Sequence, residues 1–131
     1  MSHVSQPEGS NLCGHACLAM VLGIDLEAAK ARLGHGRRTR TRELVAALGE
    51  HAEDARLRPL KKDTELPDYA ILKVTWAPNQ GHFVVYEAPL VFDPNLPGSV
   101  TFKPYYQWWV DSHKGRVTSF LALRRALPDP R

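Results

Sequence analysis

The sequence predicts an α+β fold in which an N-terminal helical half, with one buried central helix, packs on a C-terminal antiparallel β-sheet. Short apolar stripes separated by glycines fill the first 50 residues, whereas short apolar or alternating runs between turn residues follow from about residue 55. Helices followed by strands are typical of α+β proteins. The length of 131 residues indicates a single domain, 1–131, with its own hydrophobic core.

The central helix is expected from Gly14 to Leu22, an apolar segment rich in Ala and Leu that Gly23 can end. The residues before it, 7–11, have the composition of a loop. Cys13 therefore lies where a loop turns into a helix. Unpaired backbone N–H groups and the positive end of the helix dipole favour a thiolate at that position, and the thiolate is the reactive form of cysteine.

Two shorter helices follow. Asp25 is placed to cap a helix from Leu26 to Leu33. Thr41 is placed to cap a third helix, which Gly49 ends.

The second half of the chain is expected to form strands at 55–60, 69–75, 82–87, 90–93, 100–102 and 117–123. Residues 77–81 are expected to form a turn. The strands at 82–87 and 90–93 are predicted to form a hairpin across Ala88–Pro89. The aromatic run Tyr105–Val110 fits either a strand or a helical turn.

Charge is distributed unevenly. Six basic residues and no acidic residue lie between Lys30 and Arg42, whereas the other 11 Lys and Arg are accompanied by 14 Asp and Glu. This basic segment suits an acidic partner or nucleic acid, although a solvated loop and helix face is the commoner use of such residues. Because no aromatic residues are interleaved with the basic ones, no nucleic-acid partner is expected.

The two cysteines, Cys13 and Cys17, are expected to be reduced, because a bridge between adjacent helical turns would close almost no loop. Cys17 is expected to pack in the core. The chain has no apolar run of the roughly 18 residues that span a bilayer, and its first residues do not resemble a signal peptide. A cytoplasmic protein, or one exported into a target cell by a dedicated system, is therefore expected.

A nucleophilic thiolate needs an imidazole as general base and acid, and the imidazole needs an acceptor that fixes its tautomer. His82 is the best candidate among the six histidines, because it opens an apolar strand directly after Gly81. Asp93 stands 11 residues later in Val-Phe-Asp-Pro, where a tight hairpin would bring it beside His82.

These motifs, in this order, resemble those of the bacteriocin-processing cysteine peptidases, which are papain-like enzymes that cut leader peptides after a double glycine. The matching residues are Gln6, the Cys13-Gly-His-Ala-Cys stretch, Gly-His82-Phe-Val-Val-Tyr and Phe-Asp93-Pro. The resemblance implies a papain-like fold, a Cys13–His82–Asp93 triad, and an oxyanion hole completed by Gln6. It implies a protein or peptide substrate, no metal or organic cofactor and no membrane partner.

The best-known members of that family are fused to membrane transporters, and this sequence shows no such attachment. It looks more like the papain-like domains of bacterial toxins and secretion effectors. A protein of that kind would act on proteins in a target cell and would have an inhibitor or immunity protein as a further partner. Processing of leader peptides is the alternative that the first resemblance suggests.

Three other functions share parts of this pattern. A glutamine deamidase or transglutaminase-like acyl transferase would use the same triad on a side-chain amide. A metal-binding module would use Cys13, His15, Cys17 and a distant histidine, although one helical turn cannot aim all three at one ion. An inactive domain would bind peptides in the same groove without cutting them.

Overall fold

The computed structural model of the chain describes residues 1–77 and 80–125, apart from the side chain of residue 113. The elements in chain order are α1 (Cys13–Leu22), α2 (Leu26–Leu33), α3 (Thr41–Leu48), the 3-10 helix η1 (Gly49–His51), β1 (Arg58–Pro59), β2 (Tyr69–Ala77), β3 (Gln80–Glu87), β4 (Leu90–Phe92), β5 (Ser99–Thr101), α4 (Phe102–His113) and β6 (Arg116–Ala122). The predicted α+β class is confirmed.

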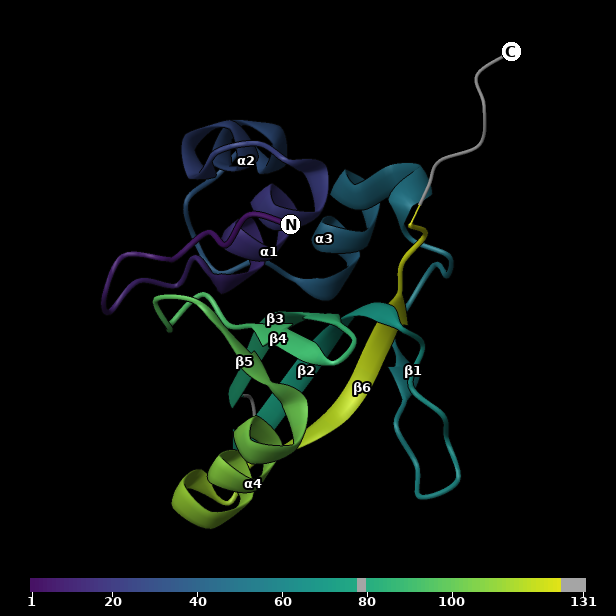
Figure 1. Cartoon of the computed structure of the whole chain (residues 1–131). Coiled ribbons are helices and arrows are strands. Elements are labelled where there is room, and N and C mark those ends of the chain that lie inside the picture. Colours follow the sequence, from purple (N-terminus) through teal and green to yellow (C-terminus); the bar gives the residue numbers. More distant parts are fainter. Residues whose placement is uncertain (78–79, 126–131) are drawn as a thin grey trace.

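The strands form one antiparallel sheet in the order β1-β6-β2-β3-β4-β5. Helices α1, α2 and α3 lie together over one side of this sheet, and α4 lies at its opposite end (Figure 1). Of the helices, α1 makes the main contact with β3, whereas α4 contacts β4, β5 and β6. Helices α1 to α3 thus cover one face of the sheet, and α4 covers the other.

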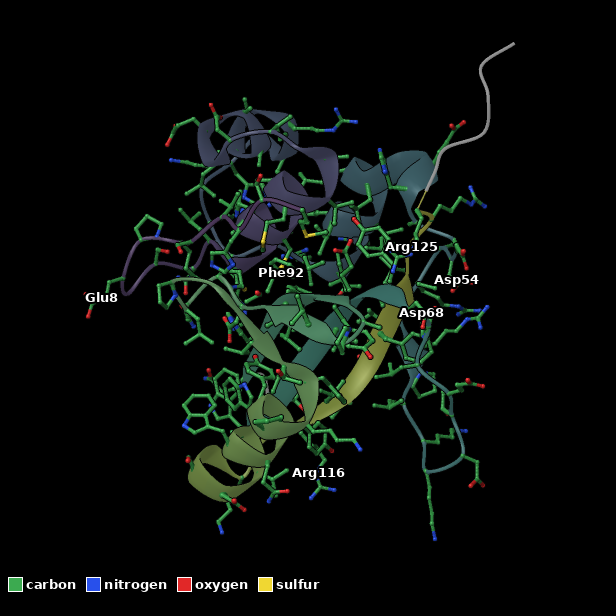
Figure 2. All side chains as sticks on the ribbon, viewed as in Figure 1. Glu8, Asp54, Asp68, Phe92, Arg116 and Arg125 are labelled. Carbon is green, nitrogen blue, oxygen red and sulfur yellow. The ribbon has the colours of Figure 1, made fainter. Side chains whose placement is uncertain are left out.

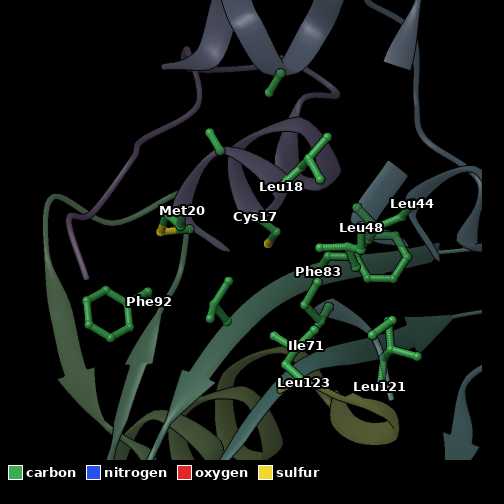
Figure 3. Packing of buried hydrophobic residues seen from close by; sticks show 14 residues of the cluster. Cys17, Leu18, Met20, Leu44, Leu48, Ile71, Phe83, Phe92, Leu121 and Leu123 are labelled. Carbon is green, nitrogen blue, oxygen red and sulfur yellow. The ribbon is translucent and has the colours of Figure 1, made fainter. Parts of the chain in front are cut away.

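The first hydrophobic core fills the space between α1, α3 and the sheet (Figure 3). Helix α1 is buried over residues 14–20, which explains why its sequence is apolar on all sides. Each fully buried Leu in this core contributes roughly 1.5–3 kcal/mol to folding. The fully buried large side chains of this core are Leu18, Leu44, Leu48, Ile71, Val85 and Leu121.

A second core lies between the other face of the sheet and α4. Successive residues of β2 point to opposite faces, so Ile71 joins the first core while Leu72 and Val74 join the second. Tyr105 and Trp109 of α4 complete this second core. Because β2 is buried on both faces over residues 70–72, its sequence there is a continuous apolar run, and the polar residues Lys73 and Thr75 follow where one face is partly exposed.

The local signals for α1 and α2 are confirmed. Asp25 caps α2 through a hydrogen bond from the Ala28 N–H to its Oδ1 (2.7 Å), and Gly23 ends α1 in the left-handed conformation. The predicted cap of α3 is wrong by one residue, because Thr41 is the first helical residue and Arg40 precedes it. Glu43 takes the capping role by accepting the Arg40 N–H at 2.9 Å.

One further prediction differs from the structure, and one assignment that the sequence left open is resolved. The strand predicted at 55–60 is reduced to β1, whose two exposed residues pair with β6 at the edge of the sheet. Pro59 has no N–H to donate and so limits this pairing. The aromatic run Tyr105–Val110 lies within α4, which accommodates Pro104 in its first turn.

The 82–87 and 90–93 hairpin is confirmed as β3 and β4, with Val85 opposite Phe92. Residues 78 and 79 of the predicted turn at 77–81 lie outside the described residues. In Figure 2, Phe92 points into the space between the helices and the sheet, whereas charged side chains such as Glu8 and Arg116 project outward. None of the helices in the described part of the chain is long and apolar enough to cross a bilayer.

Candidate active site

Cys13 is the first residue of α1, and its side chain is only partly exposed. The preceding residue, Leu12, provides no side-chain cap for the helix, so the first backbone N–H groups of α1 stay free to meet the thiol. The N–H groups of Gly14 and of Phe83 in β3 both donate to the Cys13 sulfur. The thiol therefore lies where the start of α1 meets the start of β3.

His82 stands at a part of β3 that has no partner in β4. The ladder between these strands ends at the pair Val85 and Phe92, while β3 continues to Gln80. At this end, the start of α1 and the residues that follow β4 lie against the unpaired edge of β3. His82 is only 5% exposed there.

Asp93 is the first residue after β4, and it is 2% exposed. Its Oδ1 lies 2.6 Å from His82 Nε2 and accepts the backbone N–H of Asn95 at 2.8 Å. The His82 side chain is also hydrogen-bonded to the Cys13 thiol. Since Asp93 occupies Nε2, the remaining nitrogen, Nδ1, serves Cys13. The hairpin thus brings Asp93 beside His82, and the start of α1 brings Cys13 to the other side of the imidazole. The three predicted residues form one hydrogen-bonded chain.

This arrangement favours a charged pair. Burial alone would raise the pKa of the Cys13 thiol, but the hydrogen bond and charge of His82, with the two backbone N–H groups, lower it below its ordinary value. Burial would lower the pKa of His82, but the hydrogen bonds that His82 donates to Asp93 and then to Cys13 raise it to about 9. The site therefore favours a thiolate beside an imidazolium.

Gln6 lies close to the Cys13–His82–Asp93 site, because its backbone N–H donates to the carbonyl oxygen of Pro94 at 2.9 Å. Its side-chain nitrogen Nε2 lies 2.8 Å from the Ser10 carbonyl oxygen and 3.3 Å from the Ser10 hydroxyl. The side chain thus serves the loop before α1 in this structure. Its part in an oxyanion hole stays a prediction.

Tyr105 is a further residue of the site that the sequence did not suggest. Its hydroxyl donates to Asp93 Oδ2 at 2.7 Å. The ring of Trp109, one helical turn further along α4, lies 6.4 Å from the ring of His82 and covers the histidine from the side of the second core. The one sequence signal for these roles was the aromatic run itself, whose helical form places residues four apart on one face.

The potential metal ligands Cys13, His15 and Cys17 have different surroundings. Cys17 is fully buried in the first core, and burial raises the pKa of its thiol well above the ordinary value. His15 is bound through Nε2 to the carbonyl oxygen of His35 at 2.8 Å. In the described part of the chain, no group of three or more His, Cys, Asp or Glu side chains is placed to hold a metal ion.

Comparison with known proteins finds no protein-family model that matches the chain and no curated protein that matches its sequence. The function of the chain is therefore inferred from the geometry and chemistry of Cys13, His82 and Asp93. An activated thiolate, a positively charged imidazole and a buried carboxylate form a set suited to acyl transfer.

Proposed function

We propose that the chain is a papain-like cysteine peptidase that hydrolyses peptide bonds of protein substrates. One observation carries this proposal: His82 joins the Cys13 thiol on one side to the buried Asp93 carboxylate on the other. A histidine in a structural role needs no thiol partner at a helix start, whereas a nucleophile needs both the base and its orienting acceptor.

In the first half of the reaction, the Cys13 thiolate bonds to the carbonyl carbon of the substrate, and the π electrons move onto the carbonyl oxygen. The N–H groups in the first turn of α1, which has no side-chain cap, are the donors available to this oxyanion. When the carbonyl reforms, the C–N bond breaks and the leaving amine takes the proton from His82 Nδ1. A thioester on Cys13 and a neutral His82 remain.

In the second half, His82 Nδ1 takes a proton from water as the water oxygen attacks the thioester. Collapse of this intermediate breaks the C–S bond and releases the carboxylic acid product. Cys13 leaves as a thiolate and the proton stays on His82, which restores the starting ion pair. Asp93 keeps its hydrogen bond to Nε2 throughout and so holds the ring in one orientation.

The test is expression of the wild-type protein and its Cys13→Ala variant in bacteria, followed by mass spectrometry of protein termini. New termini that depend on Cys13 support a peptidase. A gain of about one dalton on Gln side chains, without new termini, would replace the peptidase with a deamidase. Cys17→Ala is the matched control, because Cys17 lies in the core and should be dispensable for activity.

A second measurement separates an active from an inactive site. Cys13 should react with iodoacetamide at neutral pH faster than free cysteine, because the pKa of its thiol is lowered. A rate no faster than that of free cysteine would indicate an inactive domain that only binds peptides.

A further inference from the structure

We infer that a basic pocket beside His82 binds an acidic side chain of the substrate, so that the enzyme cuts within a few residues of Asp or Glu. This inference rests on the proposed peptidase function and adds the substrate class. The pocket has a volume of about 410 Å³. The residues that define this basic pocket are Arg37, Arg38, Arg40, Lys73, Gly81 and Phe83.

The basic pocket lies next to the nucleophile. Phe83, which lines the pocket, donates its backbone N–H to the Cys13 sulfur. Gly81 and Phe83 flank His82 in β3, and the side chain of His82 points to the opposite face of that strand. On the other side, Thr39 of the basic segment packs so closely on Gly14 that a Cβ there would lie 2.8 Å from the Thr39 Cβ. A peptide held at Cys13 therefore passes within one or two residues of the pocket.

Two cations of the pocket converge on one point. Arg38 Nη2 and Lys73 Nζ lie 3.7 and 3.8 Å from the position where a side chain on Gly81 would begin. Arg38 donates to the Gly81 carbonyl oxygen at 3.3 Å, and Lys73 lies over the Phe83 ring at 5.9 Å from its centroid. Within the described part of the chain, no carboxylate forms an ion pair with either cation.

Glu43 holds the loop that carries these arginines but does not neutralise the pocket. Its carboxylate accepts from His35 Nε2 at 2.9 Å and pairs with Arg37 at 3.2 Å. It also accepts the Arg40 N–H, which anchors the loop to α3. The carboxylate of Glu43 is thereby used to hold the loop in place. Arg38, Arg40 and Lys73 are left as a preformed set of positive charges.

A carboxylate is the ligand that fits this set. Like charges held close together repel each other, and an anion between them relieves the repulsion. The guanidinium of Arg38 and the ammonium of Lys73 can both donate to one carboxylate in charge-assisted hydrogen bonds. The pocket volume lies within the range typical of ligand sites, and no aromatic side chain other than Phe83 is present for base stacking. An acidic peptide is favoured over nucleic acid for this reason.

The test has a binding arm and a cleavage arm. In the binding arm, the Cys13→Ala protein is titrated with a fluorescent six-residue glutamate peptide and with the matching glutamine peptide. We expect the glutamate peptide to bind at least about tenfold more tightly, as one charge-assisted hydrogen bond would give. The preference should disappear in the additional variants Lys73→Gln and Arg38→Gln and persist in Arg42→Gln, whose exposed side chain lies outside the pocket.

In the cleavage arm, the wild-type protein digests a peptide library, and the residues around each cut are counted. Enrichment of Asp and Glu near the cut, reduced by Lys73→Gln, supports the inference. Cleavage without such enrichment, or equal binding of the two peptides, overturns it while the peptidase stands. Preferential binding of the glutamate peptide without any cleavage overturns the peptidase, and with it this assignment of substrate.

Discussion

Tyr105 donates its hydroxyl hydrogen to Asp93 Oδ2 at 2.7 Å, while Asp93 Oδ1 on the same carboxylate faces His82 at 2.6 Å. The carboxylate is thus fixed from both sides, and Tyr105 ties α4 to the Cys13–His82–Asp93 site. Both residues are almost fully buried, so this hydrogen bond does not compete with water.

Tyr105→Phe is expected to lower kcat/KM about three- to thirtyfold and to destabilise the fold by about 1–3 kcal/mol, the cost of an unsatisfied buried acceptor. Without this donor the negative charge of Asp93 is less compensated and holds the proton of His82 more firmly, so the pKa of His82 should rise and the alkaline limb of the pH profile should move up. Tyr106→Phe is the control, because Tyr106 packs at the edge of the second core. An unmoved pH profile in Tyr105→Phe would leave Tyr105 with a packing role only.

The ion pair predicts the pH dependence of the enzyme. Because the pKa of Cys13 is lowered and that of His82 is raised to about 9, thiolate and imidazolium coexist between these two values. As pH rises through about 9, His82 loses the proton that the leaving amine needs, and kcat/KM should fall. On the acid side, kcat/KM should fall only where the thiolate is protonated, below the ordinary thiol pKa of about 8.5. A single rise near pH 8.5 would contradict the ion pair.

Much of the fold was predictable because its signals are local. Asp25 and the glycines that end the first two helices act on residues only a few positions away, and the 82–87 and 90–93 hairpin is a short-range contact. Cys13, His82 and Asp93 followed from such contacts plus the chemistry that a thiolate requires.

The contributions of α4 could not be predicted because they depend on contacts between distant segments. The run Tyr105–Val110 shows no clear two-residue or 3.6-residue period, because it packs against the sheet and its own aromatic neighbours at once. Tyr105 reaches Asp93 only because β5 turns directly into α4 beside β4. The Thr41 cap was wrong because the helix begins one residue earlier, where Glu43, also held by Arg37, accepts the Arg40 N–H.

Gln6→Ala tests the oxyanion role that the resemblance implies. If Gln6 donates to the oxyanion, kcat should fall about 100- to 1,000-fold while KM stays nearly unchanged. If it only supports the loop through Ser10, kcat should stay within a few-fold and the Tm should fall instead. Ser10→Ala is a useful comparison, because it removes the hydroxyl contact at 3.3 Å and keeps the backbone acceptor.

Asp93→Asn should be milder than Asp93→Ala, for a reason that the hydrogen bonds supply. The Asn Oδ1 can still accept from His82 Nε2 and from the Asn95 N–H, which keeps Nδ1 free to act on Cys13. Its Nδ2 would face the Tyr105 hydroxyl, which can turn and accept. We expect about a tenfold loss of kcat/KM from the missing charge, with a lower pKa of His82. Asp93→Ala leaves three donors without an acceptor, two of them buried, and should cost at least about a hundredfold, together with stability.

The double variant Asp93→Asn, Tyr105→Phe tests whether the Tyr105 hydroxyl fixes the orientation of the Asn amide. Without the Tyr105 hydroxyl, the Asn Nδ2 has lost the acceptor that fixed its orientation, so the amide is free to flip and to present N–H groups to His82. The wrong tautomer of His82 would then be favoured, and the loss of kcat/KM should exceed the product of the two single losses. A double variant no worse than Asp93→Asn alone would mean that Tyr105 acts only on the charge of Asp93, because an uncharged Asn would then gain nothing from the hydroxyl.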